Sequence, residues 1–302
     1  MKLVRYIHNS TERVGHLTSS NSIVDLSSEF NCYSMTEFIS KQRHLCQKVC
    51  EYIKSTNDKI DISDVRILSP IKPRSLRDAY AFRQHVETSR RNRGLDMIEE
   101  FDNFPVYYYS NADAVTGPGD IEVDDVFMNK LDFELEVAVV ISKEGKNIPC
   151  NEADDYIAGL MIMNDFSARD LQMQEMKLNL GPAKGKDFTT SLGPCLVTLD
   201  ELTDNTTKSS EGNQYNLDME CFINNEKTSF DNLGNMSWTF AQIIERISMG
   251  TTIFPGDVIG SGTCATGCFL ELNQKNNERW LKRGDRVELR VDNLDTLTNK
   301  IV

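Results

Sequence analysis

Apolar residues alternate with other residues between Leu131 and Ile141, and a spacing of two is the period of a β-strand. The apolar positions are Phe133, Leu135, Val137, Val139 and Ile141. Successive side chains of a strand point to opposite faces, so Glu134 and Glu136 are expected together on the other face. That face continues into Ala138 and Val140, which indicates an enclosed carboxylate pair held by a hard divalent cation. The alternative is an amphipathic strand with a solvated acidic face.

A second pattern, about thirty residues further on, predicts a strand followed by a helix. Residues 160–164 predict a strand that is apolar up to Met163, and Asp165 falls at the junction. Ser167 is a candidate N-cap for the helix. Polar side chains then recur every third position, so they are expected roughly along one side of this helix: Arg169, Gln172 and Glu175.

The first 65 residues predict short strands and one helix. The strands are expected at 2–7, 15–17 and 22–26. The helix has Ser34 as its cap with Glu37 three residues later, and it is expected to end near residue 55. The later chain is richer in strand patterns, at 105–109, 195–200, 217–223 and 286–292. Short and amphipathic helices are expected at 153–160 and 238–248, and polar loops at 201–214 and 273–279.

These patterns predict a β-rich α+β fold. We expect a small N-terminal α+β cap over residues 1–65 and one catalytic domain over residues 66–302. Residues 75–86 predict a further helix with Ser75 as its cap. Asp78 and His85 are seven residues apart, so they would lie on the same side of that helix. A solvated surface is the ordinary interpretation of the basic run that follows, at Arg90, Arg91 and Arg93.

Composition narrows the classes of function. The chain has 302 residues and a net charge of −13, which argues against a nucleic-acid or anionic-membrane partner. No apolar run approaches the ~20 residues that span a bilayer, and the first residues lack the pattern of a secretory signal. The eight cysteines form no Cys-x-x-Cys pair, so we expect free thiols in a cytoplasmic protein. Nucleotide-binding glycine motifs and the Gly-x-Ser-x-Gly motif of serine hydrolases are absent from the sequence.

Carboxylates from several predicted elements suggest that the protein binds a divalent metal ion. Glu134, Glu136 and Asp165 would suit Mg²⁺ or Ca²⁺, and Asp78 could supply a fourth ligand. Such a cation could polarise an enol or keto oxygen. Three residues nearby in sequence would suit an anionic, oxygen-rich substrate: Arg169, Gln172 and Lys186. His85 is either a general base, if a carboxylate holds its tautomer, or a structural histidine.

Five segments, in order, resemble the fumarylacetoacetate hydrolase family, and the resemblance covers about residues 66 to 292. The segments are Arg77–His85, Leu131–Glu136, Asn164–Asp170, Gly185–Thr190 with Leu192–Pro194, and Gly260–Thr263. The resemblance implies a mixed β-roll fold and a homodimer. It also implies a divalent metal held by residues matching Glu134, Glu136 and Asp165, with Asp78 matching the additional ligand of the hydrolases.

The same resemblance assigns further roles. His85 matches the histidine that activates water, Glu271 matches the glutamate that orients it, and Lys186 matches a substrate-contacting position and is expected to stabilise the enolate that leaves. Further substrate-contacting positions match Tyr80, Tyr108, Arg169, Gln172 and Thr263. The chain departs from fumarylacetoacetate hydrolases themselves in its shorter N-terminal segment, in the sequence after Lys186, and in Asn111 where those enzymes have arginine. It is therefore more similar to the shorter, bacterial-type members.

The leading hypothesis is a metal-dependent hydrolase, using Mg²⁺, Ca²⁺ or Mn²⁺, that cleaves a carbon–carbon bond in an acylpyruvate-like acid. The substrate would be a small anionic 2-oxo acid. Two alternatives stay open. One keeps the metal site but isomerises, hydrates or decarboxylates a 2-oxo or 2-hydroxy dicarboxylate. The other is a metal-binding protein of this family that has lost catalysis.

Overall fold

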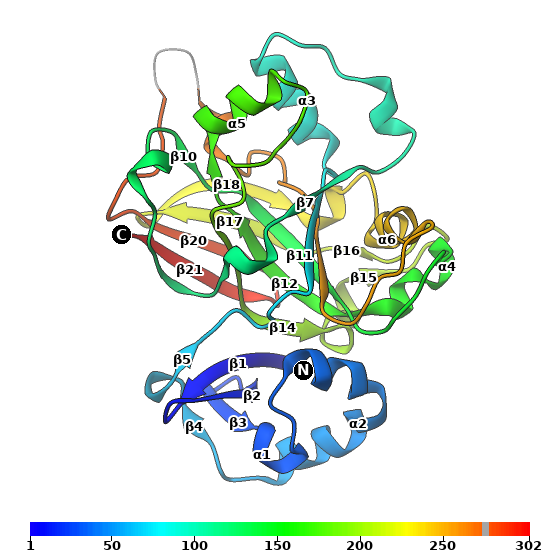
Figure 1. Ribbon diagram of the computed structural model, residues 1–302. Coiled ribbons are helices and arrows are strands. Elements are labelled where there is room, and N and C mark those ends of the chain that lie inside the picture. Colours follow the sequence, from blue (N-terminus) through cyan, green and yellow to red (C-terminus); the bar gives the residue numbers. More distant parts are fainter. Residues whose placement is uncertain (274–277) are drawn as a thin grey trace.

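The computed structural model describes residues 1–273 and 278–302, together with their side chains except those of residues 42–46. The side chain of Cys46, and residues 274–277 of the loop predicted at 273–279, fall outside this description. The described chain is rich in β-strands, and its helices lie around the sheets (Figure 1). None of the helices in the described part is long and apolar enough to cross a membrane.

A large mixed sheet runs through the molecule. Its strands follow the order β4-β3-β2-β1-β14-β12-β11-β19-β6-β7, with β5 beside β1 and β8 beside β14. Those of the N-terminal segment are β1 (Lys2–His8), β2 (Thr11–Leu17), β3 (Ser22–Asp25), β4 (Ile60–Asp61) and β5 (Arg66–Ile67). The others are β6 (Ser75–Ala79), β7 (Tyr107–Ser110), β8 (Val115–Thr116), β11 (Leu135–Ile141), β12 (Ile157–Asp165), β14 (Thr190–Thr198) and β19 (Asp257–Gly260).

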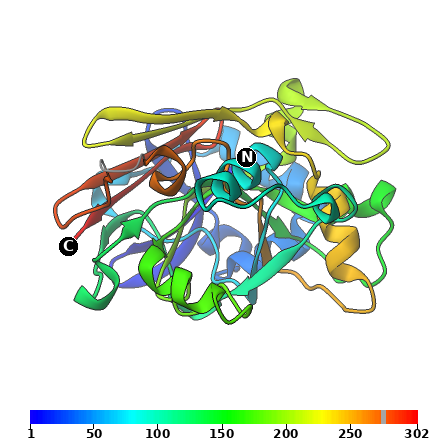
Figure 2. The same ribbon diagram turned by 90° about the horizontal axis from the view of Figure 1, so that it is seen from above.

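A smaller sheet has the order β18-β17-β20-β21-β9, and its yellow and red strands lie together along one side of the molecule in Figure 2. These strands are β9 (Gly119–Ile121), β17 (Asp218–Ile223), β18 (Glu226–Asn232), β20 (Arg286–Val291) and β21 (Asp295–Ile301). Two short pairs complete the strands: β10 (Leu131–Asp132) with β13 (Ser167–Ala168), and β15 (Thr206–Thr207) with β16 (Gln214–Tyr215). The helices are α1 (Ser27–Phe30), α2 (Met35–Ser55), α3 (Arg83–Asn92), α4 (Cys150–Ala153), α5 (Arg169–Met176), α6 (Phe240–Ser248) and α7 (Phe269–Leu272).

Strand β11 is buried on both faces. Its odd-numbered side chains, such as Val137 and Val139, belong to one apolar cluster, and Ala138 and Val140 belong to a second cluster on the opposite face. Near-continuous apolar sequence is typical of a strand covered on both sides. The predicted alternative of a solvated acidic face is therefore wrong, and Glu136 is fully buried.

The N-terminal segment forms the lower part of the molecule in Figure 1. Its strand β1 pairs with β14, where Leu3 lies opposite Leu196, so the segment continues the large sheet. Ser34 caps α2 as predicted, because its side chain accepts a hydrogen bond from the Glu37 N–H. A division into a cap of residues 1–65 and a catalytic domain of residues 66–302 stays a prediction.

The helix predicted over residues 75–86 is wrong in its first half. Residues 75–79 form strand β6, which pairs in parallel with β19 and antiparallel with β7, and helix α3 begins only at Arg83. Asp78 and His85 thus lie on different elements. Pairing with β19, about 180 residues further along the chain, outweighs the local helical pattern.

Three other predicted elements differ in detail. The short helix predicted at 153–160 ends at Tyr156, and β12 begins at Ile157. The loop predicted at 201–214 begins within a 3₁₀ helix, Leu199–Asn205, and contains β15. Ser167 does not cap α5: its hydroxyl donates to the Asp165 carbonyl within the turn before the helix.

A buried ion pair fixes β6 against the first residue of β19, Asp257. Asp257 is fully buried, accepts a hydrogen bond from Ser75 at 2.7 Å, and lies 3.4 Å from the Arg77 guanidinium. Replacing Asp257 with alanine leaves the buried Arg77 charge without this partner. We expect Asp257→Ala to lower the free energy of unfolding by about 3–5 kcal/mol, as measured by chemical denaturation.

The matched control is Glu220→Ala, which removes the more exposed pair between Glu220 and Lys227. An exposed pair contributes about 1 kcal/mol or less. Equal losses in the two variants would contradict the structural role of Asp257.

Candidate metal centre and active site

Four carboxylates meet where β6, β11 and β12 lie near one another. Asp78 comes from β6, Glu134 from the residue pair between β10 and β11, Glu136 from β11, and Asp165 from the end of β12. Each offers an oxygen atom, and these atoms all lie within 4.8 Å of one another. All four side chains are buried. The structure therefore brings together the predicted metal-ligating residues, whose role stays a prediction.

The strand registers place these side chains. Asp78 pairs with Gly260 of β19, and Gly260 also pairs with Ala138 of β11. A Cβ atom on Gly260 would lie 2.4 Å from Oδ1 of Asp78, so a glycine here leaves room for the carboxylate. On the other side, the Asn164 side chain accepts a hydrogen bond of 3.0 Å from the Glu134 N–H and fixes that residue beside β12.

Two buried cations hold the carboxylates. Lys186 donates hydrogen bonds to Glu134 and, at 2.7 Å, to Asp165. Arg169 donates from Nη2 to Glu134 at 2.7 Å and from Nε to Asp132 at 2.8 Å. Its remaining nitrogen, Nη1, donates to the Gln172 side chain at 3.0 Å. All three nitrogens of the guanidinium thus donate hydrogen bonds to other side chains of the protein. The predicted contact of Arg169 with substrate stays a prediction.

The carboxylates differ in their electrostatic surroundings. Burial raises the pKa of Glu134, but the charges of Lys186 and Arg169 outweigh it and hold that pKa at about 2. Burial, and then the charge of Asp165, raise the pKa of Asp78 to about 7. Burial, and then the charges of Asp78 and Glu134, raise the pKa of Glu136 well above its usual range. The protein's own cations thus leave part of the negative charge uncompensated, which a bound divalent cation would stabilise.

The donor set fits a hard cation. Among the described residues, Oε2 of Glu136 is buried and has no hydrogen-bond partner, whereas Oε1 accepts a bond of 3.3 Å from Thr263. An unpartnered buried carboxylate oxygen is costly unless a cation binds it. Carboxylate oxygens alone, with no thiolate or imidazole in the group, suit Mg²⁺, Ca²⁺ or Mn²⁺. Tyr108 donates a further hydrogen bond to Asp165.

A histidine–carboxylate pair lies beside this cluster. Nδ1 of His85, on α3, is 2.8 Å from Oε2 of Glu271, on α7, and both side chains are buried. Glu271 thereby fixes the proton on Nδ1 and leaves Nε2 as the ring nitrogen able to accept a proton. The two residues are 186 positions apart in the sequence, and the structure brings them together as the resemblance implied.

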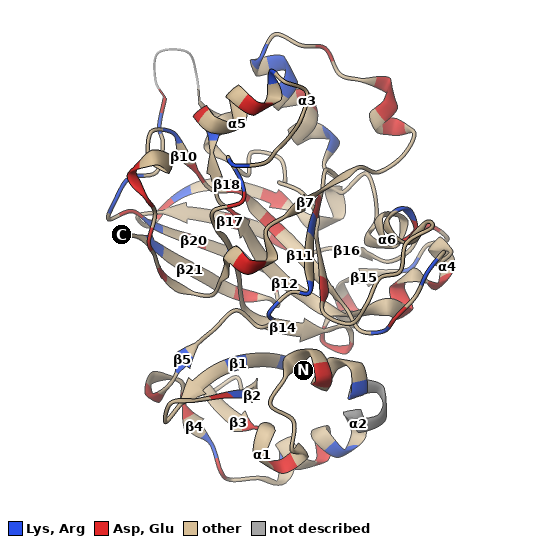
Figure 3. Ribbon diagram, in the orientation of Figure 1, with Lys and Arg blue, Asp and Glu red and all other residues tan. Residues whose placement is uncertain are grey.

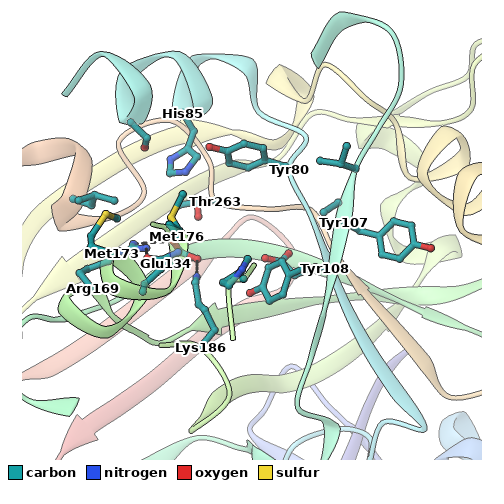
Figure 4. A pocket seen from close by; sticks show the side chains of 18 of the residues that line it. Tyr80, His85, Tyr107, Tyr108, Glu134, Arg169, Met173, Met176, Lys186 and Thr263 are labelled. Atoms are coloured by element: carbon teal, nitrogen blue, oxygen red, sulfur yellow. Dashed lines mark hydrogen bonds and ion pairs between the residues drawn. The ribbon is translucent and has the colours of Figure 1, made fainter. Parts of the chain in front are cut away.

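A cavity of about 280 Å³ opens above these groups. In Figure 4, His85 extends from α3 on one side of the cavity, and Glu134 and Lys186 lie on the other side. The predicted residues that line it are Asp78, Tyr80, His85, Tyr108, Glu134, Arg169, Gln172, Lys186 and Thr263. The rest of the wall is largely apolar, including Val106, Met173, Met176 and Leu270.

Sequence reasoning missed two residues of the site. Asp132 is buried and binds Arg169. It stands two residues before Glu134 in the same alternating pattern, and this spacing could have indicated a third carboxylate on the face of Glu134 and Glu136. Arg93 lines the cavity, although the basic run that contains it was interpreted as a solvated surface.

The fold and site have counterparts among known proteins. Residues 75–302 match the C-terminal domain of fumarylacetoacetate hydrolases, and the chain belongs to this family. The predicted resemblance and the β-rich α+β fold class are confirmed.

Two relatives are named as oxaloacetate tautomerases, and one similar solved structure is named as a maleylpyruvate hydrolase. The chain is 29% identical to the oxaloacetate tautomerase YisK of Bacillus subtilis over 273 residues, which cover 88% of this chain and 83% of that protein. It is 33% identical to the human mitochondrial oxaloacetate tautomerase FAHD2A over 199 residues, covering 66% of this chain and 59% of the human protein. The fold is similar to that of a solved structure of maleylpyruvate hydrolase from Sphingobium sp. SYK-6 in complex with manganese(II) and pyruvate. The TM-score is 0.74 and the sequence identity 18%, and the match covers 100% of this chain and 99% of that one.

The carboxylate cluster predicts a metal-dependent gain in stability. Mg²⁺ or Mn²⁺ at a hundredfold excess over its Kd would stabilise the folded state by about 2.7 kcal/mol, which raises Tm by roughly 5 °C. In Glu136→Gln we expect this rise to disappear, because a carboxylate ligand is lost, while Tm without metal does not fall. Differential scanning fluorimetry with chelator and metal add-back measures both effects.

The control is Glu122→Gln, which alters an exposed carboxylate outside the cluster. A rise in Tm that persists in Glu136→Gln, or that disappears in Glu122→Gln as well, would show that the metal acts elsewhere.

Proposed function

We propose that this protein is a divalent-metal-dependent enzyme that interconverts the keto and enol forms of a small 2-oxo acid, with oxaloacetate as the leading candidate. The observation that carries the proposal is that His85, paired with Glu271, lines one cavity with Asp78 and Glu134 of the buried carboxylate cluster. Tautomerisation needs a group that moves a proton and an environment that stabilises an enolate. The pair supplies the first, and the carboxylate cluster with its cation supplies the second.

Four carboxylates would hold the cation: Asp78, Glu134, Glu136 and Asp165. When bound, the cation supplies Lewis acidity that stabilises negative charge on the keto oxygen. Nε2 of His85 takes the proton from the carbon next to the keto group, and Glu271 stabilises the imidazolium that forms. His85 then returns the proton to the enolate oxygen, so the reaction neither adds nor removes an atom.

The surrounding residues support this chemistry. Lys186 and Arg169 keep Glu134 ionised, as the pKa of about 2 indicates, and so preserve it as a ligand. Apolar side chains around the cavity exclude water and strengthen the electrostatic interactions inside it. The names of the Bacillus and human relatives point to the same reaction, at 29% and 33% identity.

The second candidate is hydrolysis of a carbon–carbon bond in an acylpyruvate. The same His85–Glu271 pair favours it, because a histidine that accepts a proton from a substrate carbon can also accept one from water. His85 would then activate water for attack on the distal carbonyl, and Lys186 would help to stabilise the enolate that leaves. Hydrolysis incorporates an oxygen atom from water into the product carboxylate, whereas tautomerisation does not, so ¹⁸O-labelled water distinguishes the two reactions.

A homodimer and a cytoplasmic location belong to this proposal as well. The homodimer rests on the family resemblance, and the location rests on the cysteines with described side chains, which are all free thiols. Sedimentation analysis at several protein concentrations measures the oligomeric state.

Removing the proton-moving pair tests the proposal. We expect His85→Ala to lower kcat for enol-to-keto conversion of oxaloacetate by about 10²- to 10⁴-fold, because proton transfer by a positioned group contributes about this much. Glu271→Gln should lower kcat less, since the imidazole remains. The loss of enol absorbance, corrected for the uncatalysed rate, measures both effects.

The metal-dependent rise in Tm should persist in both variants, because neither side chain belongs to the carboxylate cluster. His8→Ala, in the N-terminal strand β1, is the matched control and should retain full activity. Unchanged kcat in His85→Ala would overturn the assigned role of this histidine in both candidate reactions.

A further inference from the structure

A histidine, a cysteine and a glutamate converge beside the cavity. One ligand atom from each of His85, Cys268 and Glu271 lies within 4.8 Å of the other two. Among the described residues, this group and the four carboxylates are the two sets of three or more acidic, histidine or cysteine side chains that converge this closely. Proton transfer by His85 and Glu271 leaves the buried Cys268 thiol without a part.

Two contacts of this group meet at a single oxygen atom. Oε2 of Glu271 lies 2.8 Å from Nδ1 of His85, and Sγ of Cys268 donates a hydrogen bond of 3.9 Å to the same oxygen. A nitrogen, a sulfur and an oxygen therefore face one another, with two protons between them. A metal ion bound to all three atoms would replace both protons.

The spacing of these atoms suits a zinc ion. Bonds from Zn²⁺ are about 2.0–2.2 Å to nitrogen and oxygen and about 2.3 Å to sulfur, so a tetrahedral site places its ligand atoms roughly 3.3–3.6 Å apart. The observed separations of 2.8 and 3.9 Å lie on either side of that range. Shifts of about 0.5 Å would close the site around the ion, and water would fill the fourth position.

The backbone fixes the two helices that carry these ligands. Asp132 accepts hydrogen bonds from the N–H groups of Phe269 at 2.8 Å and Leu270 at 3.0 Å, and so fixes the start of α7 directly after Cys268. Asn92, the last residue of α3, donates from its side chain to the Glu271 carbonyl at 3.3 Å. The ligand atoms are thus positioned without a metal.

The donor atoms distinguish this group from the carboxylate cluster. A thiolate and an imidazole favour Zn²⁺, whereas the oxygen atoms of the cluster favour Mg²⁺, Ca²⁺ or Mn²⁺. Burial raises the pKa of the Cys268 thiol well above its usual range, so the thiol keeps its proton until a metal binds. Coordination by a metal removes such a proton.

Charge also favours a cation here. Asp and Glu outnumber Lys and Arg by 46 to 33, and Figure 3 shows them in both the upper and the lower part of the molecule. Within the group, Glu271 carries one negative charge, while the thiol and the imidazole are neutral. Binding of Zn²⁺ with loss of the thiol proton brings the charge of the group to zero, which is favourable in a buried place.

We propose that His85, Cys268 and Glu271 form an inhibitory Zn²⁺ site. The ion bonds to Nδ1 of His85, Sγ of Cys268 and a carboxylate oxygen of Glu271. Nδ1 and the thiol each lose a proton, and Nε2 of His85 gains one, so one proton is released in total. Nε2 then has no lone pair with which to accept a proton from substrate. Binding of Zn²⁺ is independent of the reaction, and only the inhibition rests on the proposed function.

Co²⁺ is the probe for this site, because it occupies Zn²⁺ sites and its bond to a thiolate absorbs in the near ultraviolet. The protein is first saturated with Mg²⁺ to fill the carboxylate cluster. One equivalent of Co²⁺ should then produce the thiolate absorption, and Zn²⁺ should abolish it by displacing Co²⁺. Absence of this absorption in the unaltered protein would overturn the proposal.

Two cysteine variants assign the sulfur. Cys268→Ala should lose the absorption and bind Zn²⁺ at least about 100-fold more weakly, because loss of even an outer-shell partner costs 10- to 100-fold. Cys264→Ala is the matched control, since Cys264 is equally buried and four residues earlier, and it should keep the absorption. Absorption that persists in Cys268→Ala, or that depends on Cys264, would overturn the proposal.

X-ray absorption at the zinc edge needs no variant, so it tests the site even if Cys268→Ala does not fold. The Mg²⁺-saturated protein with one equivalent of Zn²⁺ should show one sulfur at about 2.3 Å together with nitrogen and oxygen ligands. A shell of oxygen atoms alone would overturn the proposal.

Activity measurements separate this site from the proposed function. In the Mg²⁺-saturated protein, Zn²⁺ should lower kcat for oxaloacetate by about 100-fold or more, because proton transfer is blocked. Cys268→Ala, compared with its own rate without Zn²⁺, should resist this loss, and Cys264→Ala should not. If no 2-oxo acid is converted but the thiolate absorption depends on Cys268, the proposed function fails and the Zn²⁺ site stands. If oxaloacetate is converted and Zn²⁺ bound at Cys268 leaves kcat unchanged, the inhibitory role fails and the proposed function stands.

Discussion

Mutual repulsion among four buried carboxylates is the constraint on which the rest of this structure depends. Asp78, Glu134, Glu136 and Asp165 are enclosed where water cannot screen them, so each negative charge must be neutralised by a proton or by a nearby cation. Lys186 and Arg169 neutralise Glu134 directly, and Lys186 also reaches Asp165. Asp78 and Glu136 lack a cationic partner of their own among the described residues. The uncompensated charge is what makes this place a candidate metal centre.

The neighbouring elements follow from the same constraint. Gly260 leaves space for Asp78, and Asn164 fixes the backbone of Glu134. The His85–Glu271 pair, from two helices far apart in sequence, then adds a group that accepts a proton beside the place where negative charge can be stabilised. Proton transfer next to a stabilised enolate is common to tautomerisation and carbon–carbon hydrolysis. The two reactions differ in whether His85 receives its proton from carbon or from water.

Local sequence patterns predicted the central strands well. The alternation from Phe133 to Ile141 and the apolar run before Asp165 both correspond to strands. A spacing of two is the period of a strand, and a strand that is buried on both faces has a near-continuous apolar sequence. The strand around Asp78 was predicted as a helix, since its identity depends on pairing with β19 across a large separation in sequence. Sequence spacing also could not show that Arg169 is engaged within the protein or that Arg93 faces the cavity. Both depend on how α3 and α5 pack over the sheet.

The central claim is that the four carboxylates hold one divalent cation, and diffraction from crystals grown with Mn²⁺ tests it most directly. The account predicts one strong anomalous peak per chain, surrounded by oxygen atoms of Asp78, Glu134, Glu136 and Asp165 at about 2.0–2.6 Å, the range of hard-cation sites. The account would be contradicted if these carboxylates showed no peak at saturating Mn²⁺ while the protein remained folded. A peak bound only by other residues would contradict it equally.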